Sequence, residues 1–149
     1  TGWLFVSFEG HVFEATVVDG AVRVAEPWSL LTDDDREAGW RIGGRQPFAY
    51  NAETGLLVAL VHEGGGQETF EDAGTEVWGF STQTRRRGYR LALAGAEAPE
   101  RASGVQLTED AAPLLLIAPD DGDALRIHDG RTGRHLRSMP DLGGLVQNL

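Results

Sequence analysis

The chain is organised around one stretch, Gly39-Trp40-Arg41-Ile42-Gly43-Gly44-Arg45-Gln46-Pro47-Phe48-Ala49-Tyr50. We predict that Gly39–Gly44 ends a long loop and that Arg45–Tyr50 forms an apolar strand. The paired glycines allow the backbone a sharp turn. Pro47 lies near the start of the strand, where a missing N–H is tolerated. One three-strand pattern precedes this stretch and two longer patterns follow it, so we expect it to join repeated sheets.

Three short strands are predicted before this joint, at Trp3–Phe8, His11–Val18 and Ala21–Ala25. Their aromatic and β-branched residues favour strands, and Asp19-Gly20 is a strong hairpin signal. Pro27 is expected to end this antiparallel meander. The meander has no partner before its first strand, which suggests a sheet that lacks its opening strand.

A single helix is predicted at about Thr32–Ala38, within the long connection Trp28–Gly44. Thr32 and Asp35 have the spacing of a capping box, and Gly39 stands where a helix commonly stops. The run Asp33-Asp34-Asp35 could in principle bind calcium. A helix first turn explains all three carboxylates, because the positive end of the helix dipole favours negative charge.

Two further units have four predicted strands each, at Arg45–Tyr50, Leu56–His62, Glu76–Thr82 and Tyr89–Ala94, and at Ser103–Leu107, Leu114–Ala118, Ala124–Asp129 and Arg134–Met139. Gly55 aligns with Ala112 at an offset of 57, whereas Ser81 aligns with Asp129 at an offset of 48. The shorter loop Pro119–Asp123 absorbs the difference. A four-stranded repeat of roughly 50 residues is typical of a β-propeller.

The apolar runs Leu56–Val61 and Leu114–Ile117 do not alternate, which is typical of strands buried on both faces. We therefore predict an all-β fold, a β-propeller of four-stranded antiparallel blades. The domains are a partial blade at 1–26, full blades at 45–94 and 103–139, and the start of a closing strand at 143–149. A β-sandwich is the competing fold, but it does not need the repeat.

Fewer than three blades are present, whereas propellers have four to eight. We expect the C-terminal part of a larger propeller, whose open arc exposes an apolar flank at each end. The chain begins at Thr1 without a methionine, so we expect it to be processed or cut from something longer.

Composition narrows the function. The 149 residues carry a net charge of −10, and every basic residue is an arginine. That balance argues against nucleic acid and anionic lipid, which need basic faces. No apolar run approaches the roughly 20 residues that span a membrane. The absence of cysteine excludes a disulfide, a thiol nucleophile and a thiolate metal site in this segment.

Loop lengths indicate which end of the sheets binds. The connections Trp28–Gly44 and Glu63–Thr75 are the two longest and should emerge on one face, where binding usually resides. The opposite face has short turns, at Asn51–Gly55, Gln83–Gly88 and Gly130–Gly133.

Several polar groups have both a functional and a structural interpretation. His62 and Glu63 could ligate a metal or move protons, but no second histidine is near in sequence. His11, His128 and His135 are expected to be surface or hydrogen-bonded residues. Other short signals favour turns: Asp120-Asp121-Gly122-Asp123 lacks the distal glutamate of a calcium loop, and Arg85-Arg86-Arg87 is a basic turn that could also be a docking spot. No nucleophile triad, phosphate-binding glycine motif or catalytic carboxylate pair stands out.

A set of motifs resembles the large subunit of quinoprotein amine dehydrogenases, the methylamine and aromatic amine dehydrogenases. The matching residues are Trp28-Ser29-Leu30-Leu31-Thr32, Ala38-Gly39-Trp40-Arg41, Gly43-Gly44, Gln46-Pro47, Ala49-Tyr50, His62, Gly64-Gly65, Gly74-Thr75-Glu76-Val77-Trp78, Asp110-Ala111-Ala112-Pro113-Leu114-Leu115 and Leu142-Gly143. The resemblance covers nearly the whole chain and aligns with the C-terminal portion of that subunit. Arg45, Asn51 and Thr69-Phe70-Glu71 depart from the family pattern.

This resemblance implies a seven-bladed propeller of periplasmic origin without a cofactor of its own. It implies a partner small (light) subunit that holds tryptophan tryptophylquinone and performs the chemistry, in a heterotetramer of two large and two small subunits. It also implies electron transfer to a small blue copper protein such as amicyanin or azurin.

We expect this chain to contribute no catalytic residue and no metal ligand. Partner-binding residues are predicted on the long-loop face, at Trp40, Arg41, Arg45, His62, Glu63 and Gly64. Trp40 and Arg41 could equally anchor their loop. The alternative function is a propeller-type protein-binding module without enzymatic activity.

Overall fold

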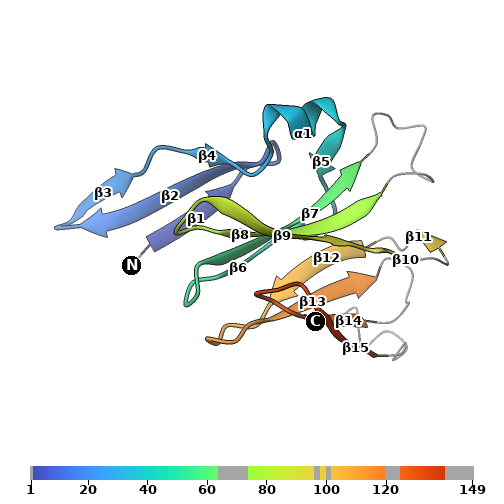
Figure 1. Ribbon diagram of the computed structural model, residues 1–149. Helices are drawn as coiled ribbons and strands as arrows, with labels where there is room; N and C mark the ends of the chain where they lie inside the picture. Colours follow the sequence, from blue (N-terminus) through green and yellow to red (C-terminus); the bar gives the residue numbers. More distant parts are fainter. Residues whose placement is uncertain (1, 64–73, 96–97, 100–101, 120–124, 140–149) are drawn as a thin grey trace.

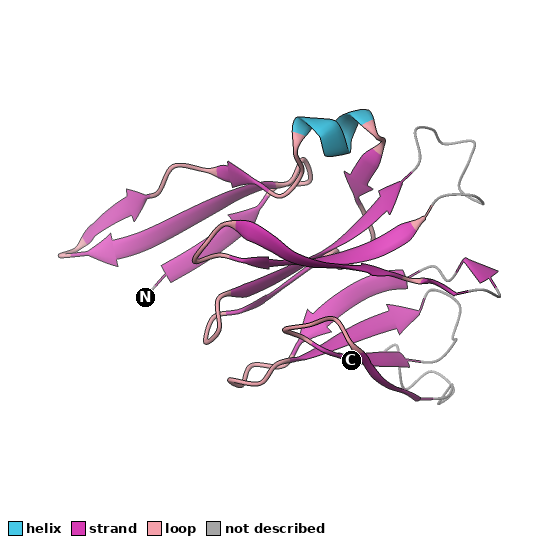
Figure 2. Ribbon diagram, viewed as in Figure 1, coloured by secondary structure: helices cyan, strands magenta, loops and turns pink. Residues whose placement is uncertain are grey.

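The computed structural model describes residues 2–63, 74–95, 98–99, 102–119 and 125–139. Within them the fold is almost entirely antiparallel β-structure, with one short helix (Figure 2). Figure 1 shows three sheets arranged one after another along the chain. The all-β class is confirmed. Three sheets packed in series are not the two facing sheets of a sandwich.

The first sheet contains β1 (Gly2–Val6), β2 (His11–Val18), β3 (Ala21–Val24) and β4 (Trp28–Ser29). Val12 pairs with Val6 of β1 and with Trp28 of β4, so β1 and β4 lie on opposite edges of β2. β3 is on the same edge as β4. The prediction that Pro27 ends this sheet was wrong. Pro27 only interrupts the edge, because pairing with β2 resumes one residue later, at Trp28.

The helix lies where the sequence predicts it. α1 spans Asp33–Glu37, and both hydrogen bonds of the capping box between Thr32 and Asp35 are present. Gly39 follows with a φ of 92°, a left-handed conformation that favours glycine. The helix lies over the gap between the first and second sheets (Figure 1).

The second, central sheet contains β5 (Trp40–Ile42), β6 (Phe48–Asn51), β7 (Leu56–Glu63), β8 (Thr75–Ser81) and β9 (Arg86–Ala92). β5 and β6 pair with successive halves of β7, so they form one interrupted edge strand. The prediction of a loop up to Gly44 was wrong for Trp40–Ile42. The predicted strand start at Arg45 was also wrong, because pairing begins at Phe48.

A short hairpin of β10 (Ala94–Gly95) and β11 (Ala98–Pro99), which the sequence did not suggest, leads to the third sheet. This sheet contains β12 (Ala102–Leu107), β13 (Leu114–Pro119), β14 (Leu125–Asp129) and β15 (His135–Met139) in chain order. The predicted closing strand at 143–149 lies outside the described residues.

The register of the hairpins tests the internal repeat. Leu56 pairs with Ser81 and Leu114 pairs with Asp129, so the predicted offset of 48 between Ser81 and Asp129 holds only if the preceding strand has an offset of 58. The same pairs give 114 − 56 = 58 for the preceding strand, one more than the predicted 57. The turn before β13, residues 108–113, is two residues longer than the turn before β7, residues 52–55.

The core consists of two hydrophobic clusters, one on each side of the central sheet. Leu57, Ala59 and Val61 of β7 face the first sheet, whereas Val58 and Leu60 face the third. All five are fully buried. This confirms the prediction for Leu56–Val61. The same prediction was wrong for Leu114–Ile117, where Leu115 and Ile117 are buried but Leu114 is 37% exposed, because only one face of β13 is covered.

One face of the first sheet is uncovered. Alternation along the paired strands places one group of apolar side chains on the face away from the central sheet. These side chains are 38% to 66% exposed, and they are Trp3, Phe5, Phe13, Val17, Val22 and Val24. We call this set the apolar flank. It confirms the expectation of an exposed apolar surface at the N-terminal end of the arc.

Candidate functional site

The predicted partner-binding residues lie around β5 and the end of β7. Register pairs Trp40 with Glu63 and Arg41 with His62 across these strands. The structure therefore brings four of the six predicted residues together at one end of the central sheet. Gly64 lies outside the described residues. Arg45 is in the segment between β5 and β6, on the same sheet edge.

Trp40 is buried, with 7% of its surface exposed. Its ring packs against Trp78 of β8 at 5.2 Å between centroids, and the Arg90 guanidinium lies 5.0 Å from the ring centre. The indole thus fills the space between α1, β5 and β8, as the anchor interpretation predicts. It fixes β5 onto the sheet and presents little surface to a partner.

An arginine–tryptophan stack, which the sequence did not reveal, surrounds Trp40. Arg90 lies 4.8 Å from the Trp78 ring, and Arg87 lies 4.7 Å from the same ring. Such cation–π contacts contribute about 0.5–2 kcal/mol each, depending on solvent exposure. The side chains from β9 therefore cover the tryptophans from the outer side.

Acidic side chains hold the arginines of this stack in place. Glu76 Oε1 accepts from Arg90 Nε and from Trp78 Nε1, both at 2.8 Å. The hydrogen bond with Glu76 raises the pKa of Arg90, although desolvation opposes this shift. Arg87 reaches Asp35 of α1 at 3.7 Å. The capping box, the helix and the central sheet are joined through these contacts.

His62 is a hydrogen-bonded bridge between two strands. Its Nε2 lies 3.2 Å from the Gly43 carbonyl oxygen and its Nδ1 lies 3.1 Å from Thr75 Oγ1. Because a carbonyl can only accept, Nε2 carries the proton and donates, and Nδ1 accepts from the threonine hydroxyl. Both ring nitrogens are engaged, which leaves neither lone pair directed at a metal. In the described part of the chain no three metal-binding side chains cluster.

Arg41, which pairs with His62, and Arg45, in the segment after β5, are both exposed. Within the described residues neither guanidinium has a carboxylate at ion-pair distance. Arg45 is held by its backbone, since its N–H donates to the Ser103 carbonyl at 2.9 Å. We call Arg41 and Arg45 the arginine edge. On a chain with a net charge of −10, this edge is a local exception.

The segment that carries Arg45 lies tightly against the third sheet. A side chain on Gly44 would clash, because its Cβ would come within 2.9 Å of Leu60 and 3.1 Å of the Ser103 oxygen. Gly44 also has a φ of 125°. The paired glycines therefore permit a close approach between sheets, which agrees with the predicted joint.

Most remaining candidates have structural partners. Arg85 pairs with Glu14 at 3.2 Å, whereas Arg86 is exposed. The basic turn was predicted at Gln83–Gly88, but β9 already begins at Arg86. His11 lies 3.6 Å from Glu9 and His135 bonds Ser138. The acidic turn at 120–123 lies outside the described residues.

His128 has a less common environment. It is 2% exposed, and its Nδ1 donates to the Gly133 carbonyl at 2.9 Å. Its Nε2 is buried without a hydrogen-bond partner among the described residues. Burial, opposed by the Gly133 hydrogen bond, lowers the pKa of His128, and the nearby His135 and Arg126 lower it further. This histidine is neutral in the fold.

The described residues form antiparallel sheets in series, which defines an all-β protein. Residues 2–147 match the family model of the methylamine dehydrogenase heavy chain, and the chain belongs to this family. The resemblance stated from the motifs is thereby confirmed.

Three relatives are methylamine dehydrogenase heavy chains. Those of Methylobacillus flagellatus and Paracoccus versutus are each 26% identical over 92% of this chain, and the chain covers 33% and 31% of their lengths. That of Methylophilus methylotrophus is 22% identical over 92% of this chain, which covers 32% of its length. The chain thus spans about a third of the relatives that it matches. In the described residues no helix is long and apolar enough to cross a membrane.

Proposed function

We propose that this chain is part of the non-catalytic large subunit of an amine dehydrogenase that oxidatively deaminates primary amines. The family match over residues 2–147 carries this proposal. In the proposed enzyme, a small subunit holds tryptophan tryptophylquinone and performs the oxidation, and a blue copper protein such as amicyanin or azurin receives the electrons. The assembly is a periplasmic heterotetramer of two large and two small subunits.

The three sheets are proposed to be blades of a seven-bladed propeller. In such a fold every blade packs against two neighbours, as the central sheet does here. The apolar flank of the first sheet supports the idea, because a preceding blade would cover it. Soluble monomers rarely expose contiguous apolar patches above a few hundred Å².

The tryptophans of this chain are proposed to have packing roles, and the quinone is assigned to the partner. Trp40 and Trp78 stack on each other, and Arg90 covers both rings. The Trp78 N–H is committed to Glu76 at 2.8 Å. These contacts fit side chains that hold β5, α1 and β8 together.

The small subunit is proposed to bind at the arginine edge together with His62, Glu63 and Gly64. Arginine dominates many interfaces because it buries area and makes several directional hydrogen bonds. Within the described residues, Arg41 of β5 and Arg45 of the segment after it have no carboxylate at ion-pair distance. Trp40 contributes by positioning β5.

The test titrates the small subunit against variants of the full-length large subunit. Arg41→Ala and Arg45→Ala should each weaken assembly by roughly 1–3 kcal/mol if they are hot spots. Arg86→Ala is the matched control, because Arg86 is an exposed arginine on the outer strand β9. Its assembly should be unchanged. Trp40→Ala is less informative here, since loss of a buried indole destabilises the fold itself.

The opposite pattern, in which Arg86→Ala weakens assembly and the two edge variants do not, would move the interface to another face. The second candidate function, a propeller-type protein-binding module without enzymatic activity, rests on the fold alone. Copurification of the full-length protein with a small subunit that has quinone absorption separates the two functions. Its absence favours the binding module.

A further inference from the structure

A cavity of about 520 Å³ lies between the central and third sheets, at the end opposite the predicted binding face. It is lined by the turn before β7, the ends of β8 and β9, and two turns of the third sheet. Ligand-binding cavities for small molecules commonly have volumes of about 300–1,000 Å³. The size therefore suits one small organic molecule.

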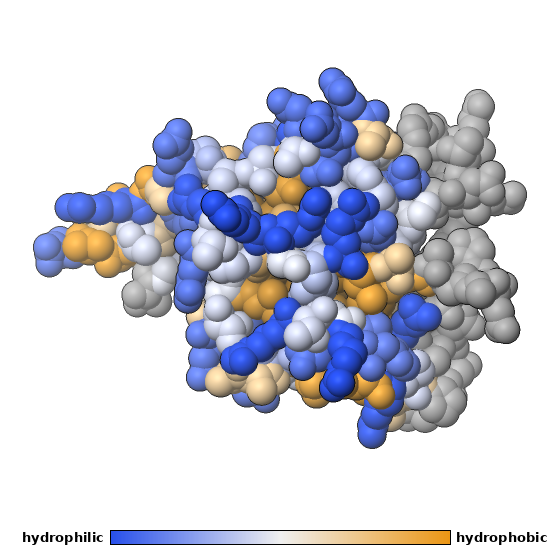
Figure 3. Space-filling model, viewed as in Figure 1, coloured by the Kyte–Doolittle hydropathy of each residue, from blue (hydrophilic) through white to orange (hydrophobic). Residues whose placement is uncertain are grey.

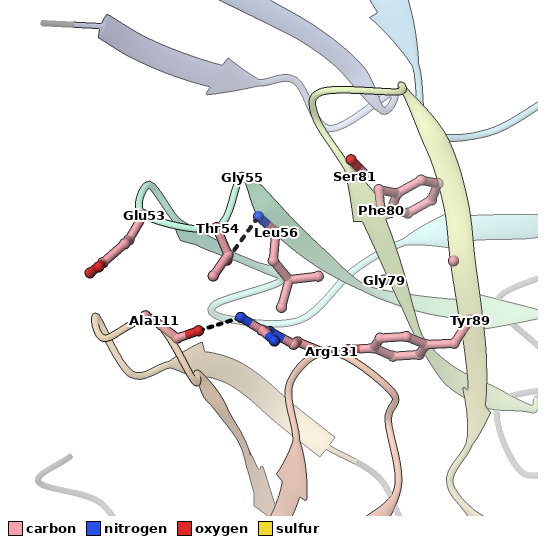
Figure 4. Close-up of a pocket in the computed structure, with 11 residues that line it drawn as sticks. Glu53, Thr54, Gly55, Leu56, Gly79, Phe80, Ser81, Tyr89, Ala111 and Arg131 are labelled. Atoms are coloured by element: carbon pink, nitrogen blue, oxygen red, sulfur yellow. Dashed lines mark hydrogen bonds between the residues drawn. The ribbon is translucent and has the colours of Figure 1, made fainter.

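One wall of the cavity is apolar and rigid. Leu56 of β7 and Tyr89 of β9 line it (Figure 4). Tyr89 donates through its hydroxyl to the Gly130 carbonyl at 2.8 Å, and a Cβ on Gly133 would come within 2.8 Å of its ring. Burial, together with the charge of Asp129, raises the pKa of Tyr89, so the hydroxyl stays protonated. The ring is thus fixed as a flat apolar surface.

The turn of the third sheet beside Tyr89 carries a positive charge. Arg131 lines the cavity, and one of its five N–H donors is engaged, by the Ala111 carbonyl at 2.6 Å. In the described part of the chain no carboxylate lies within ion-pair distance of this guanidinium. Glu53 is at the rim, but its carboxylate points away from Arg131 (Figure 4).

The surface around the opening has the same character. Figure 3 shows hydrophobic surface between the strongly hydrophilic side chains over β9 and those over the third sheet. Carboxylates are also near, because Glu53 lines the cavity and the charge of Asp129 acts on Tyr89, so attraction for an anion depends on the Arg131 guanidinium itself.

We propose that this cavity binds a small amphipathic carboxylate, with its apolar body against Leu56 and Tyr89 and its carboxylate on Arg131. Planar guanidinium groups bind carboxylates through two parallel hydrogen bonds, which are stronger than neutral ones. A neutral analogue should bind more weakly because it loses these bonds. A cationic analogue should bind least, since it faces Arg131 without a counter-charge.

The test is calorimetric titration of the full-length protein with 4-phenylbutyrate, 4-phenylbutan-1-ol and 4-phenylbutylamine. The acid should bind at one saturable site, about tenfold tighter than the alcohol, which corresponds to one charge-assisted hydrogen bond. The amine should give no saturable heat. Equal affinity for acid and amine would overturn the proposal, as would the absence of saturable binding by the acid.

Two substitutions locate the site. Arg131→Gln should lower the affinity for the acid to that of the alcohol, and Arg131→Lys, which keeps the charge but loses the planar fork, should fall between them. Arg134→Gln is the matched control. Arg134 is an exposed arginine three residues after Arg131, and it does not line the cavity. Melting temperatures of the variants check that they fold. Binding that ignores Arg131→Gln, including adventitious binding to the apolar flank, would overturn the assignment.

Discussion

The two interfaces of the central sheet use different chemistry. Towards the first sheet, the contact is aromatic, and Trp28, Phe80 and Trp78 form a chain of rings with centroid spacings of 6.3 and 6.5 Å. Towards the third sheet the contact is aliphatic, and Val58, Leu60 and Val105 are among its fully buried members. The central sheet therefore packs on the first sheet through aromatic side chains and on the third through aliphatic ones.

Polar contacts separate the interfaces further. At the third sheet, backbone groups bond directly between sheets: Gln46 donates to the Ser103 oxygen at 3.2 Å and accepts from Val105 at 3.0 Å. Among the described residues, the first interface is joined instead through side chains, as in the Arg85–Glu14 pair at 3.2 Å. Backbone bonding requires the close approach that Gly44 and Gly104 allow.

The largest expected effect is at the aromatic interface. Trp78→Ala should lower the free energy of unfolding by about 3–5 kcal/mol, because a fully buried indole leaves a cavity. Urea unfolding measures the loss. Hydrogen exchange should become faster mainly in the first sheet, since Trp78 belongs to the cluster on that side.

Val77→Ala is the matched variant, because Val77 is the chain neighbour of Trp78 and its side chain faces the third sheet. Its loss should be smaller, and its faster exchange should appear at β12 and β13. Identical exchange patterns in the two variants would mean that the interfaces do not act independently.

The next effect concerns a polar link in the aliphatic interface. Asn51 is 1% exposed, and its side-chain nitrogen donates to the carbonyls of Thr108 and Asp110 at 2.7 and 2.9 Å. Its oxygen accepts from Thr54. Asn51→Ala should lower the free energy of unfolding, measured with urea, by about 1–3 kcal/mol, because the carbonyls of Thr108 and Asp110 lose their donor and the buried amide is removed.

Asn51→Asp sharpens the same point at constant size. Near neutral pH its carboxylate would face two carbonyl oxygens, so the variant should be at least as unstable as Asn51→Ala. Protonation at acidic pH removes the buried charge and should reduce the difference from the parent. A pH-independent penalty would show that the carbonyls have turned away.

The smallest effect is a pH dependence at the same interface. Because the folded-state pKa of His128 is lowered below the usual 6.5, the unfolded chain binds the proton more readily. Its contribution is therefore fully present above pH 6.5 and is lost as the pH falls below that value. His128→Gln should reduce the change in the urea unfolding midpoint between about pH 7 and pH 5. His11→Gln, at an intermediate-exposure site, should keep the slope of the parent, and an equal slope in His128→Gln would contradict the assignment.

The sequence by itself determined the local elements and their order. The apolar run Leu57–Val61 predicted a strand covered on both faces, because apolar and polar residues would alternate along a strand with one face in solvent. Thr32, Asp35 and Gly39 predicted the helix, since capping is a local interaction. The motifs from Trp28 to Leu115 also predicted the family, to which the chain was then assigned.

Tertiary structure decided what depends on register and on close approach. An extra residue at Gly88 shifts the pairing from Phe80–Arg87 to Gly79–Tyr89, and this bulge places Arg90 beside Trp78. The local sequence does not predict this bulge. The arginine–tryptophan stack and the position of Tyr89 in the cavity wall therefore could not be predicted. Likewise, Trp40–Ile42 forms a strand because the end of β7 offers unpaired backbone groups there. Long-range pairing, which sequence neighbours do not encode, settles both features.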